Sequence, residues 1–225
     1  MNMYFHIKQL SVLSFLLAAL LLNSAAQGYS IQMKYTDNAI QNMQMELVWQ
    51  IDKNNCKLQL KNRFEGKNVS SLFFTDKANN TIKMMDENPE NGKKIFYTIS
   101  TTSLKPDARF DYKRGKAVLT SESKTIAGIP CKKVIFNTEK FNCEFWLAES
   151  LPDVKPWASF FQSYPELNGI AESELSGFPL ASTIKDAAGN VIVTLEATNV
   201  QKTPLTEADF KVPSTYIDAS TLQRK

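Results

Sequence analysis

The sequence predicts a mainly β protein, built as one curved antiparallel sheet or incomplete β-barrel with an inserted aromatic helix. Strand-forming segments follow one another between Tyr29 and Val200, and turn-forming residues separate them. Several of these segments alternate apolar and polar residues with the period of two that is typical of a half-buried strand. One segment near residue 160 differs, because prolines bound it and its aromatic residues have helical spacing.

The N-terminal segment, residues 1–26, is predicted to be a cleaved signal peptide. Lys8 supplies a positive charge ahead of the apolar run Leu10–Leu22. Ser24 and Ala26 then provide the small residues of a cleavage site. The apolar run has about 13 residues, which is short of the roughly 20 that a membrane-spanning helix needs. A retained signal anchor is the alternative.

Residues 27–225 are expected to form a single domain, because about 200 residues suit one domain. No cysteine lies at the predicted cleavage site, so no lipid anchor is expected there. We therefore expect a periplasmic or secreted protein that has no transmembrane segment once the signal peptide is removed.

The charge and the histidine content argue against several functions. The net formal charge of +3 gives no electrostatic reason to expect binding to nucleic acid. The single histidine, His6, lies in the predicted signal peptide, which leaves no histidine for a nucleophilic pair or a metal site. Ser121 and Lys124 match a Ser-x-x-Lys pattern, but that pattern needs a helical turn and this segment is strand-like. We therefore expect no enzyme activity, no catalytic residues, no metal and no cofactor.

The three cysteines are an odd number for an oxidising compartment. A bridge between Cys131 and Cys143 depends on the register of a hairpin, which decides whether the two side chains share a face. Buried free cysteines on strands are the other interpretation. The sequence leaves both open, and Cys56 has no evident partner in either.

Asn42–Asp52 is predicted to be a strand with one apolar face, because its apolar and polar residues alternate. A helical reading leaves Met45 and Trp49 unexplained. Cys56–Phe64 repeats the alternation and places a cationic strip, Lys57–Arg63, on the opposite face. Such a strip is typical of a solvated outer sheet face, and contact with an anionic lipid or polymer is the alternative.

The remaining elements follow in series. Strands are predicted at Val69–Thr75, Thr81–Met85, Lys94–Ser100, Ala117–Ile126, residues 131–136, residues 143–147, Phe178–Lys185 and Val191–Val200. Residues 131–147 are expected to form a hairpin across Asn137–Lys140. Lys105–Gly115 is expected to be a longer connection. Thr206–Phe210 is expected to form a helical turn before a frayed tail.

The aromatic helix is predicted between Pro156, which suits a first helical turn, and Pro165, which ends it. Its aromatic residues fall on one stripe, at positions Trp157, Phe160, Phe161 and Tyr164. One interpretation is that this stripe packs the helix on the sheet. The other is that the helix is a lid over a ligand cavity.

Several short motifs carry a resemblance to a known family. They are Thr125–Lys133, Phe145–Ala148, Gly177–Leu180, and Leu205–Phe210 followed by Pro213 and Tyr216. Together they resemble a family of exported bacterial domains of unknown function (DUF4412-like), which is similar in turn to the LolA/LppX-type lipoprotein carriers of the periplasm. The resemblance covers roughly residues 120–217. It implies a LolA-like half-open β-barrel with a helical plug, binding of acyl chains by analogy, and no known catalytic residues.

We therefore expect a periplasmic protein that binds or carries an apolar ligand, either a lipid or the acyl chain of a lipoprotein. Burial of the ligand would supply affinity, at about 0.8 kcal/mol per CH2 group. The expected ligand-binding residues are Met43, Met45, Leu47, Trp49, Leu58, Leu60, Trp157, Phe160, Phe161 and Tyr164. The alternative is an interaction module with a filled core, whose outer face or edge binds an envelope protein or a surface polymer. Whether the concave face is open or filled distinguishes the two.

Overall fold

The computed structural model describes residues 26–40, 43–64, 67–87, 92–105, 115–162 and 164–222. The predicted signal peptide, apart from Ala26, and most of the connection Lys105–Gly115 lie outside the described residues. The strands are β1 (Ala26–Asp37), β2 (Met43–Ile51), β3 (Cys56–Phe64), β4 (Lys67–Asp76), β5 (Thr81–Glu87), β6 (Lys94–Ser100), β7 (Lys116–Ile126), β8 (Ile129–Asn137), β9 (Phe141–Ala148), β10 (Phe178–Asp186), β11 (Val191–Leu205) and β12 (Ile217–Asp218). The helical elements are the 3-10 helices η1 (Thr101–Ser103), η2 (Lys155–Phe160), η3 (Glu207–Phe210) and η4 (Ala219–Thr221), and the α-helix α2 (Pro165–Ala171).

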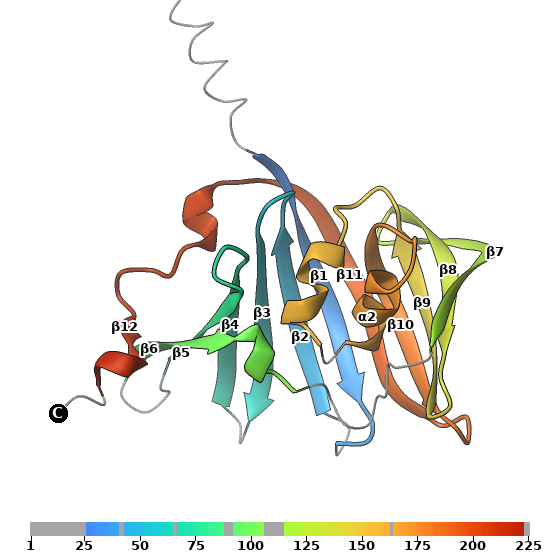
Figure 1. Ribbon diagram of the computed structural model, residues 1–225, viewed down its shortest axis with the longest axis horizontal. Helices are drawn as coiled ribbons and strands as arrows, with labels where there is room; N and C mark the ends of the chain where they lie inside the picture. The colour runs from blue at the N-terminus through green and yellow to red at the C-terminus, as the bar shows by residue number, and fades with distance from the viewer. Residues whose placement is uncertain are drawn as a thin grey trace, which may run out of the picture.

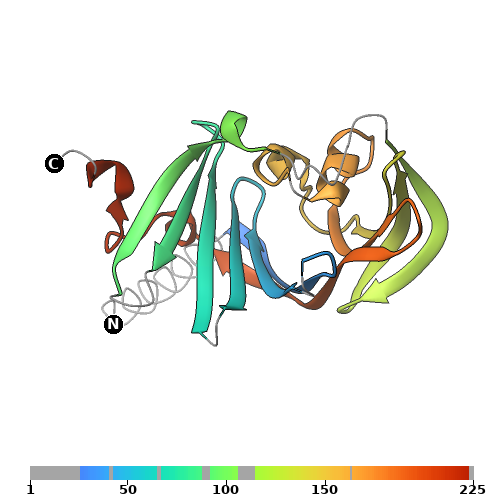
Figure 2. The same cartoon turned by 90° about the horizontal axis from the view of Figure 1, so that it is seen from below.

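The described strands form one sheet in the order β12-β6-β5-β4-β3-β2-β1-β11-β10-β9-β8-β7 (Figure 1). Neighbouring strands are antiparallel, except that β12 and β6 are parallel. The sheet bends, and η2 and α2 lie on the inner side of the bend (Figure 2). We call this side the concave face and the other side the convex face. The structure confirms the prediction of a mainly β fold with a curved antiparallel sheet and an inserted helix.

The alternation seen in the sequence determines which side chains of β2 face inward. Leu47, Trp49 and Ile51 are buried, whereas Gln44 and Glu46 are exposed. Burial of large apolar side chains is the main favourable term in folding, so this strand has only one stable orientation in the sheet. The predicted strands Asn42–Asp52 and Cys56–Phe64 correspond to β2 and β3.

The helix α2 packs closely against the ring of Phe136 on β8. A Cβ atom added at Gly169 of α2 would lie 3.1 Å from Cγ of this ring, and a Cβ atom added at Gly115 would overlap the ring from another direction. The ring is therefore wedged between two glycine backbones. This close approach brings α2 down onto the strands on this side of the concave face.

The predicted single helix from Pro156 to Pro165 is wrong in its extent. The structure contains two shorter elements, because η2 ends at Phe160 and α2 begins at Pro165. Tyr164 between them is extended, with φ −106° and ψ 104°. A residue before proline is disfavoured in the α region, whereas proline itself suits a first helical turn. Pro165 therefore starts a helix where the sequence pattern indicated an end.

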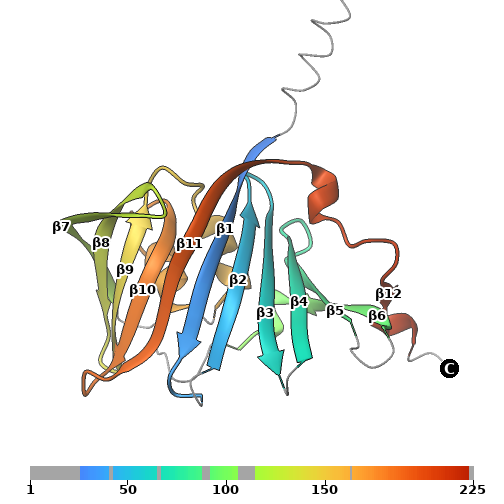
Figure 3. The same ribbon diagram turned by 180° about the vertical axis from the view of Figure 1, so that it is seen from behind.

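The prediction of a frayed C-terminal tail is also wrong. Ile217 and Asp218 pair with Ile95 and Phe96 of β6, and the described chain continues into η4. The segment that leads there crosses from the end of β11, through η3, to the far edge of the sheet (Figure 3). A two-residue strand has no periodic pattern, so the pairing could not be predicted from the sequence.

The three cysteines are free and buried. Cys143 lies opposite Phe136, five positions along β8 from Cys131. At about 3.3 Å per residue this separates the two by roughly 16 Å along the strands, far beyond the reach of a disulfide. The structure thus selects the interpretation of buried free cysteines.

Candidate functional site

A row of apolar side chains crosses the concave face from β11 to β6. The pairing registers place these residues directly opposite one another in successive strands: Val200, Ile31, Trp49, Leu58, Phe73, Met84 and Tyr97. Opposite residues in paired strands project to the same face of a sheet. We call η2, α2 and the residues between them (155–171) the covering segment. Trp49 contacts Phe161 of this segment, so this face is the concave one. We call this set the apolar row.

Exposure increases along the apolar row from β1 to β6, whereas Val200 on β11 is half-buried. Trp49 and Leu58 are each 2% exposed, Phe73 and Met84 are half-buried, and Tyr97 is 39% exposed. The fully buried residues of the row lie on β1, β2 and β3, and the accessible ones lie on β4 to β6. The row therefore passes through the hydrophobic core and ends as an accessible apolar surface on the same face.

The covering segment is held to the sheet by an aromatic cluster around Trp49. The centroid of the Trp49 ring lies 4.7 Å from that of Phe161, 6.0 Å from that of Tyr164 and 5.6 Å from that of Phe178, in edge-to-face arrangements. Tyr164 also meets Tyr35 of β1 at 6.4 Å. Such pairs contribute about 0.5–1.5 kcal/mol each beyond the burial of their area. The cluster joins η2 and the start of α2 to strands β1, β2 and β10.

A cation–π contact holds η2 from the opposite direction. Lys77 lies in the turn between β4 and β5, and its Nζ is 3.6 Å from the ring centroid of Trp157. Burial lowers the pKa of Lys77. Trp157 is 1% exposed, so the indole is packed on its other sides as well.

The structure divides the ten residues that the sequence indicated. The buried members are Leu47, Trp49, Leu58, Trp157, Phe160 and Phe161, and the partly accessible members are Met43, Met45, Leu60 and Tyr164. The structure brings Trp49, Phe161 and Tyr164 into contact with one another. Trp157 instead contacts Phe160 and Lys77. The buried six are core residues in this conformation, and a ligand could reach them only if η2 moved.

Phe73, Met84 and Tyr97 were not selected from the sequence, although the strands that carry them were predicted. Short strands give few alternating positions, so the side that faces inward is ambiguous. The signal that identifies these residues is the pairing register with Leu58.

Glu166, at the start of α2, carries a buried carboxyl. Its side chain is 2% exposed, and its Oε2 has no hydrogen-bond partner. Burial raises the pKa of Glu166 to about 7. Burial, together with the charge of Glu166, also raises the pKa of Cys143 on β9. The carboxyl therefore favours its neutral form inside the protein. Among the described residues, no group of three or more His, Cys, Asp or Glu side chains could hold a metal ion.

The lysines on the convex side of β3 make contacts within the chain. Of the predicted cationic strip, Lys57 donates to the backbone carbonyl of Asp209 at 2.9 Å, and Lys61 pairs with Glu46 at 2.8 Å. These contacts satisfy the two lysines within the chain. They favour the interpretation of this strip as an outer sheet face.

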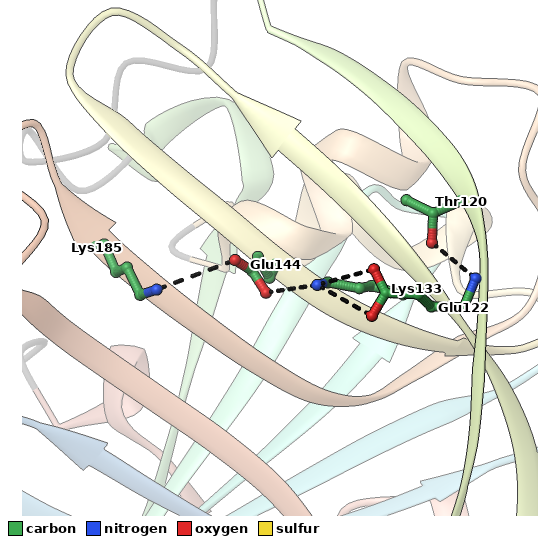
Figure 4. Close-up of polar contacts among 5 residues, drawn as sticks. All are labelled: Thr120, Glu122, Lys133, Glu144 and Lys185. Carbon is green, nitrogen blue, oxygen red and sulfur yellow. Dashed lines mark hydrogen bonds and ion pairs between the residues drawn. The ribbon is translucent and has the colours of Figure 1, made fainter.

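A line of ion pairs crosses four strands on the β7 side of the sheet (Figure 4). Lys133 lies 3.2 Å from Glu122 and 3.1 Å from Glu144, and Lys185 lies 4.0 Å from Glu144. The hydrogen bonds that Lys133 donates to Glu144 and Glu122 raise the pKa of Lys133. Cross-strand pairs of opposite charge support one register over its neighbours. This arrangement ties β7, β8, β9 and β10 together.

In the part of the chain that the structure describes, no helix has the length and hydrophobicity needed to span a bilayer.

Solved structures similar to this chain match it at low sequence identity. PNGF-II is 17% identical over 87% of this chain and 32% of its own, with a TM-score of 0.45. A chain of the MucA/MucB complex of Pseudomonas aeruginosa is 11% identical over 85% of this chain and 57% of its own, with a TM-score of 0.46. A LolA superfamily protein from Nitrosomonas europaea is 8% identical over 84% of this chain and 91% of its own, with a TM-score of 0.31. This chain thus spans about a third of the length of PNGF-II and under two thirds of the MucA/MucB chain that it matches.

No curated protein matches the sequence. A sequence family described as a domain of unknown function, DUF4412, matches residues 27–216, which is most of the chain. The match includes the motifs that carried the resemblance in the sequence. This chain belongs to the DUF4412 family.

Proposed function

We propose that this protein binds an apolar ligand, a lipid or the acyl chain of a lipoprotein, on its concave face and catalyses no reaction on it. The observation that carries the proposal is the apolar row, which runs from buried Trp49 to exposed Tyr97 without a polar interruption. An apolar ligand chain that lies on the accessible end of the apolar row would remove its own apolar surface and that of the row from water. This contributes about 25 cal/mol per Å² of apolar area.

The ligand would first contact Phe73, Met84 and Tyr97. Methionine adapts to irregular apolar surfaces, and Met84 and Met45 are both partly accessible on this face. Displacement of η2 would then extend the site toward Leu58 and Trp49. The contacts of η2 with Lys77 and Trp49 oppose this displacement, so they set how readily the inner part of the site opens.

The predicted signal peptide supports a location in the periplasm or outside the cell. The lack of histidine after His6 supports a role without acid–base catalysis.

A second candidate function is protein–protein interaction through the edge strand β7. Val118 is 51% exposed and Leu119 is 39% exposed on this strand. An edge strand offers unpaired backbone groups to which another chain can add a strand. The burial of six of the ten predicted site residues favours this candidate over a wide-open cavity.

Native mass spectrometry of the protein purified from a periplasm, followed by lipid extraction, tests the first candidate. We expect a co-purified lipid in stoichiometric amount, or uptake of added palmitate. Met84→Ser and Tyr97→Ser are expected to reduce this uptake. Val118→Ser, on edge strand β7 at the other end of the sheet, is expected to leave it unchanged. A mass without ligand, and no uptake of palmitate or a lipopeptide, would eliminate the apolar-ligand proposal. Loss of a co-purified envelope protein in the Val118→Ser variant would support the second candidate.

A further inference from the structure

A groove on the convex face lies apart from the concave site. Its volume is about 690 Å³, and it lies between β3, β4, the end of β5 and the C-terminal segment that leads to β12. Its lining includes Gln59, Asn68, Ser70, Leu72, Glu87 and Tyr216. Gln59 and Leu72 are opposite each other in register, one position along from the inward-facing pair Leu58 and Phe73. They therefore face outward, on the side opposite the apolar row.

The C-terminal segment forms one wall of this groove and is anchored on both sides of Tyr216. Before it, the carbonyl of Asp209 accepts a hydrogen bond from Lys57 of β3 at 2.9 Å. After it, Ile217 pairs with Ile95 of β6. The backbone N–H of Tyr216 donates to the carbonyl of Pro213 at 3.0 Å, which closes a turn. These contacts hold Tyr216 at the wall of the groove.

The polar side chains of the groove contact one another but keep donors and acceptors available to a ligand. Gln59 donates from Nε2 to Oγ of Ser70 at 2.8 Å, which orients the amide and leaves its carbonyl oxygen as an acceptor. Glu87 lies 3.6 Å from Lys94, so its charge is partly compensated. Asn68 is exposed, and its amide both donates and accepts.

The lining chemistry excludes several classes of ligand. Lysine and arginine usually bind an anionic group, and neither is among the described lining residues; Lys94 at the edge of the groove lies 3.6 Å from Glu87 and 5.9 Å from the centroid of the Tyr216 ring, so its charge is already partly compensated. A single carboxylate is too few for a dedicated divalent-cation site. An acyl chain would cover the amides of Gln59 and Asn68 without satisfying them, which costs free energy.

We propose that this groove binds a neutral saccharide. The hydroxyl groups of a sugar both donate and accept, which matches the amides, the serine hydroxyl and the carboxylate. The C–H face of a sugar ring is apolar enough to pack on the ring of Tyr216 and on Leu72, with weak C–H contacts to the aromatic face. A pocket with an apolar wall and a few placed polar groups is the usual form of a small-ligand site. The site is on the opposite face from the apolar row, so it does not depend on the proposed function.

Isothermal titration of the purified protein with maltohexaose, cellohexaose and chitohexaose tests this proposal. We expect at least one of them to bind with one-to-one stoichiometry. Asn68→Ala and Tyr216→Ala are each expected to weaken binding about tenfold or more, whereas Tyr216→Phe keeps the ring and stays within about threefold. Asn68 is exposed on β4, so its variant tests the groove without loosening the C-terminal segment.

Tyr97→Ala is the matched control, because it removes an accessible tyrosine from the opposite face. It is expected to leave saccharide binding unchanged and to reduce palmitate uptake. Tyr216→Ala is expected to weaken saccharide binding and to leave palmitate uptake unchanged. The proposal is overturned if none of the three sugars binds at millimolar concentration. It is equally overturned if a bound sugar is unaffected by both Asn68→Ala and Tyr216→Ala. Either result would leave the concave-face proposal standing.

Discussion

Lys77 and Trp157 form a contact in which the lysine Nζ lies 3.6 Å from the centroid of the indole ring. The lysine belongs to the turn between β4 and β5, and the tryptophan belongs to η2, 80 positions later in the chain. The contact therefore ties the outer strands of the sheet to the segment that covers its concave face. It identifies η2 as a packed element that is fastened at two places, since Trp49 and Phe161 form the other attachment.

Replacing Lys77 by methionine is expected to weaken this attachment while keeping a similar side-chain length. Lys77 is exposed, and a cation–π contact at an exposed site contributes about 0.5–1 kcal/mol, so we expect a loss of about that size in the free energy of unfolding. Urea denaturation followed by tryptophan fluorescence measures it. Lys53→Met, in the exposed turn between β2 and β3, serves as the control and should change stability by less than about 0.5 kcal/mol. Equal effects of the two substitutions would show that the contact contributes nothing.

Trp157→Ala and Phe161→Ala distinguish a core element from a mobile lid. Both side chains are buried in the structure, so each substitution is expected to cost about 3–5 kcal/mol of stability. Tyr97→Ala, at an accessible position on the same face, should cost far less. Chemical denaturation gives the three values, and palmitate uptake is measured in parallel. If Trp157→Ala lowered stability by under about 1 kcal/mol and altered uptake, η2 would be a lid and not part of the core.

Glu166 is expected to make stability depend on pH. Its pKa rises from its ordinary value of 4.5 to about 7 on folding, so the native state binds more protons than the unfolded state between these values. The contribution of Glu166 to the free energy of unfolding is therefore highest below about pH 4.5. It falls as the pH rises toward 7 and does not change further above about pH 7. The total change is about 3 kcal/mol, because each pKa unit corresponds to 1.36 kcal/mol.

Glu166→Gln removes this titration, so its unfolding free energy should lose the decline between pH 4.5 and 7 and exceed that of the unmodified protein at pH 8. Once residues 1–26 are removed, no histidine titrates in the same window. Glu172→Gln, exposed at the end of α2, is the control and should keep the decline. An identical pH profile for Glu166→Gln and the unmodified protein would falsify the assignment.

Gly169→Ala tests the seating of α2 on Phe136. Alanine normally stabilises a helix interior by about 1 kcal/mol relative to glycine. Here the added Cβ would lie 3.1 Å from the Phe136 ring, and the backbone of Gly115 limits the ring's retreat. We expect Gly169→Ala to lower the free energy of unfolding by about 1–3 kcal/mol, which is the usual cost of inserting extra atoms into a packed core. Thermal unfolding of Gly169→Ala, Phe136→Leu and the double variant gives the coupling energy, and additive effects would contradict this packing.

The strands of this protein follow from local sequence features. β3 and β6 begin and end where the sequence analysis placed them, and β2 agrees within a residue at each end. The reason is that Leu47, Trp49 and Ile51 must share one face to be buried, and only a strand with a period of two allows this. The turn before β11 is similarly local, because Gly189 has a φ of +90° that glycine adopts without strain.

The candidate site could be predicted only in part. Trp49, Phe161 and Tyr164 were selected from the sequence and meet in the structure. The accessible end of the apolar row was not selected, because its membership depends on how β4, β5 and β6 pair, and a shift of one residue would turn the other face inward. The split of the aromatic helix at Tyr164 was also missed, since proline is compatible with both the end and the start of a helix.

The amino-acid sequence by itself determined the class of fold, the succession of strands along the chain and the apolar character of one face, because these depend on residues that are neighbours in the chain. Only the tertiary structure decided which residues share a row, that Cys131 and Cys143 lie apart, and that Tyr216 closes a groove against Gln59. Those relationships join residues that are distant in the chain. They are set by strand register and by the packing of side chains against one another, which no local pattern encodes.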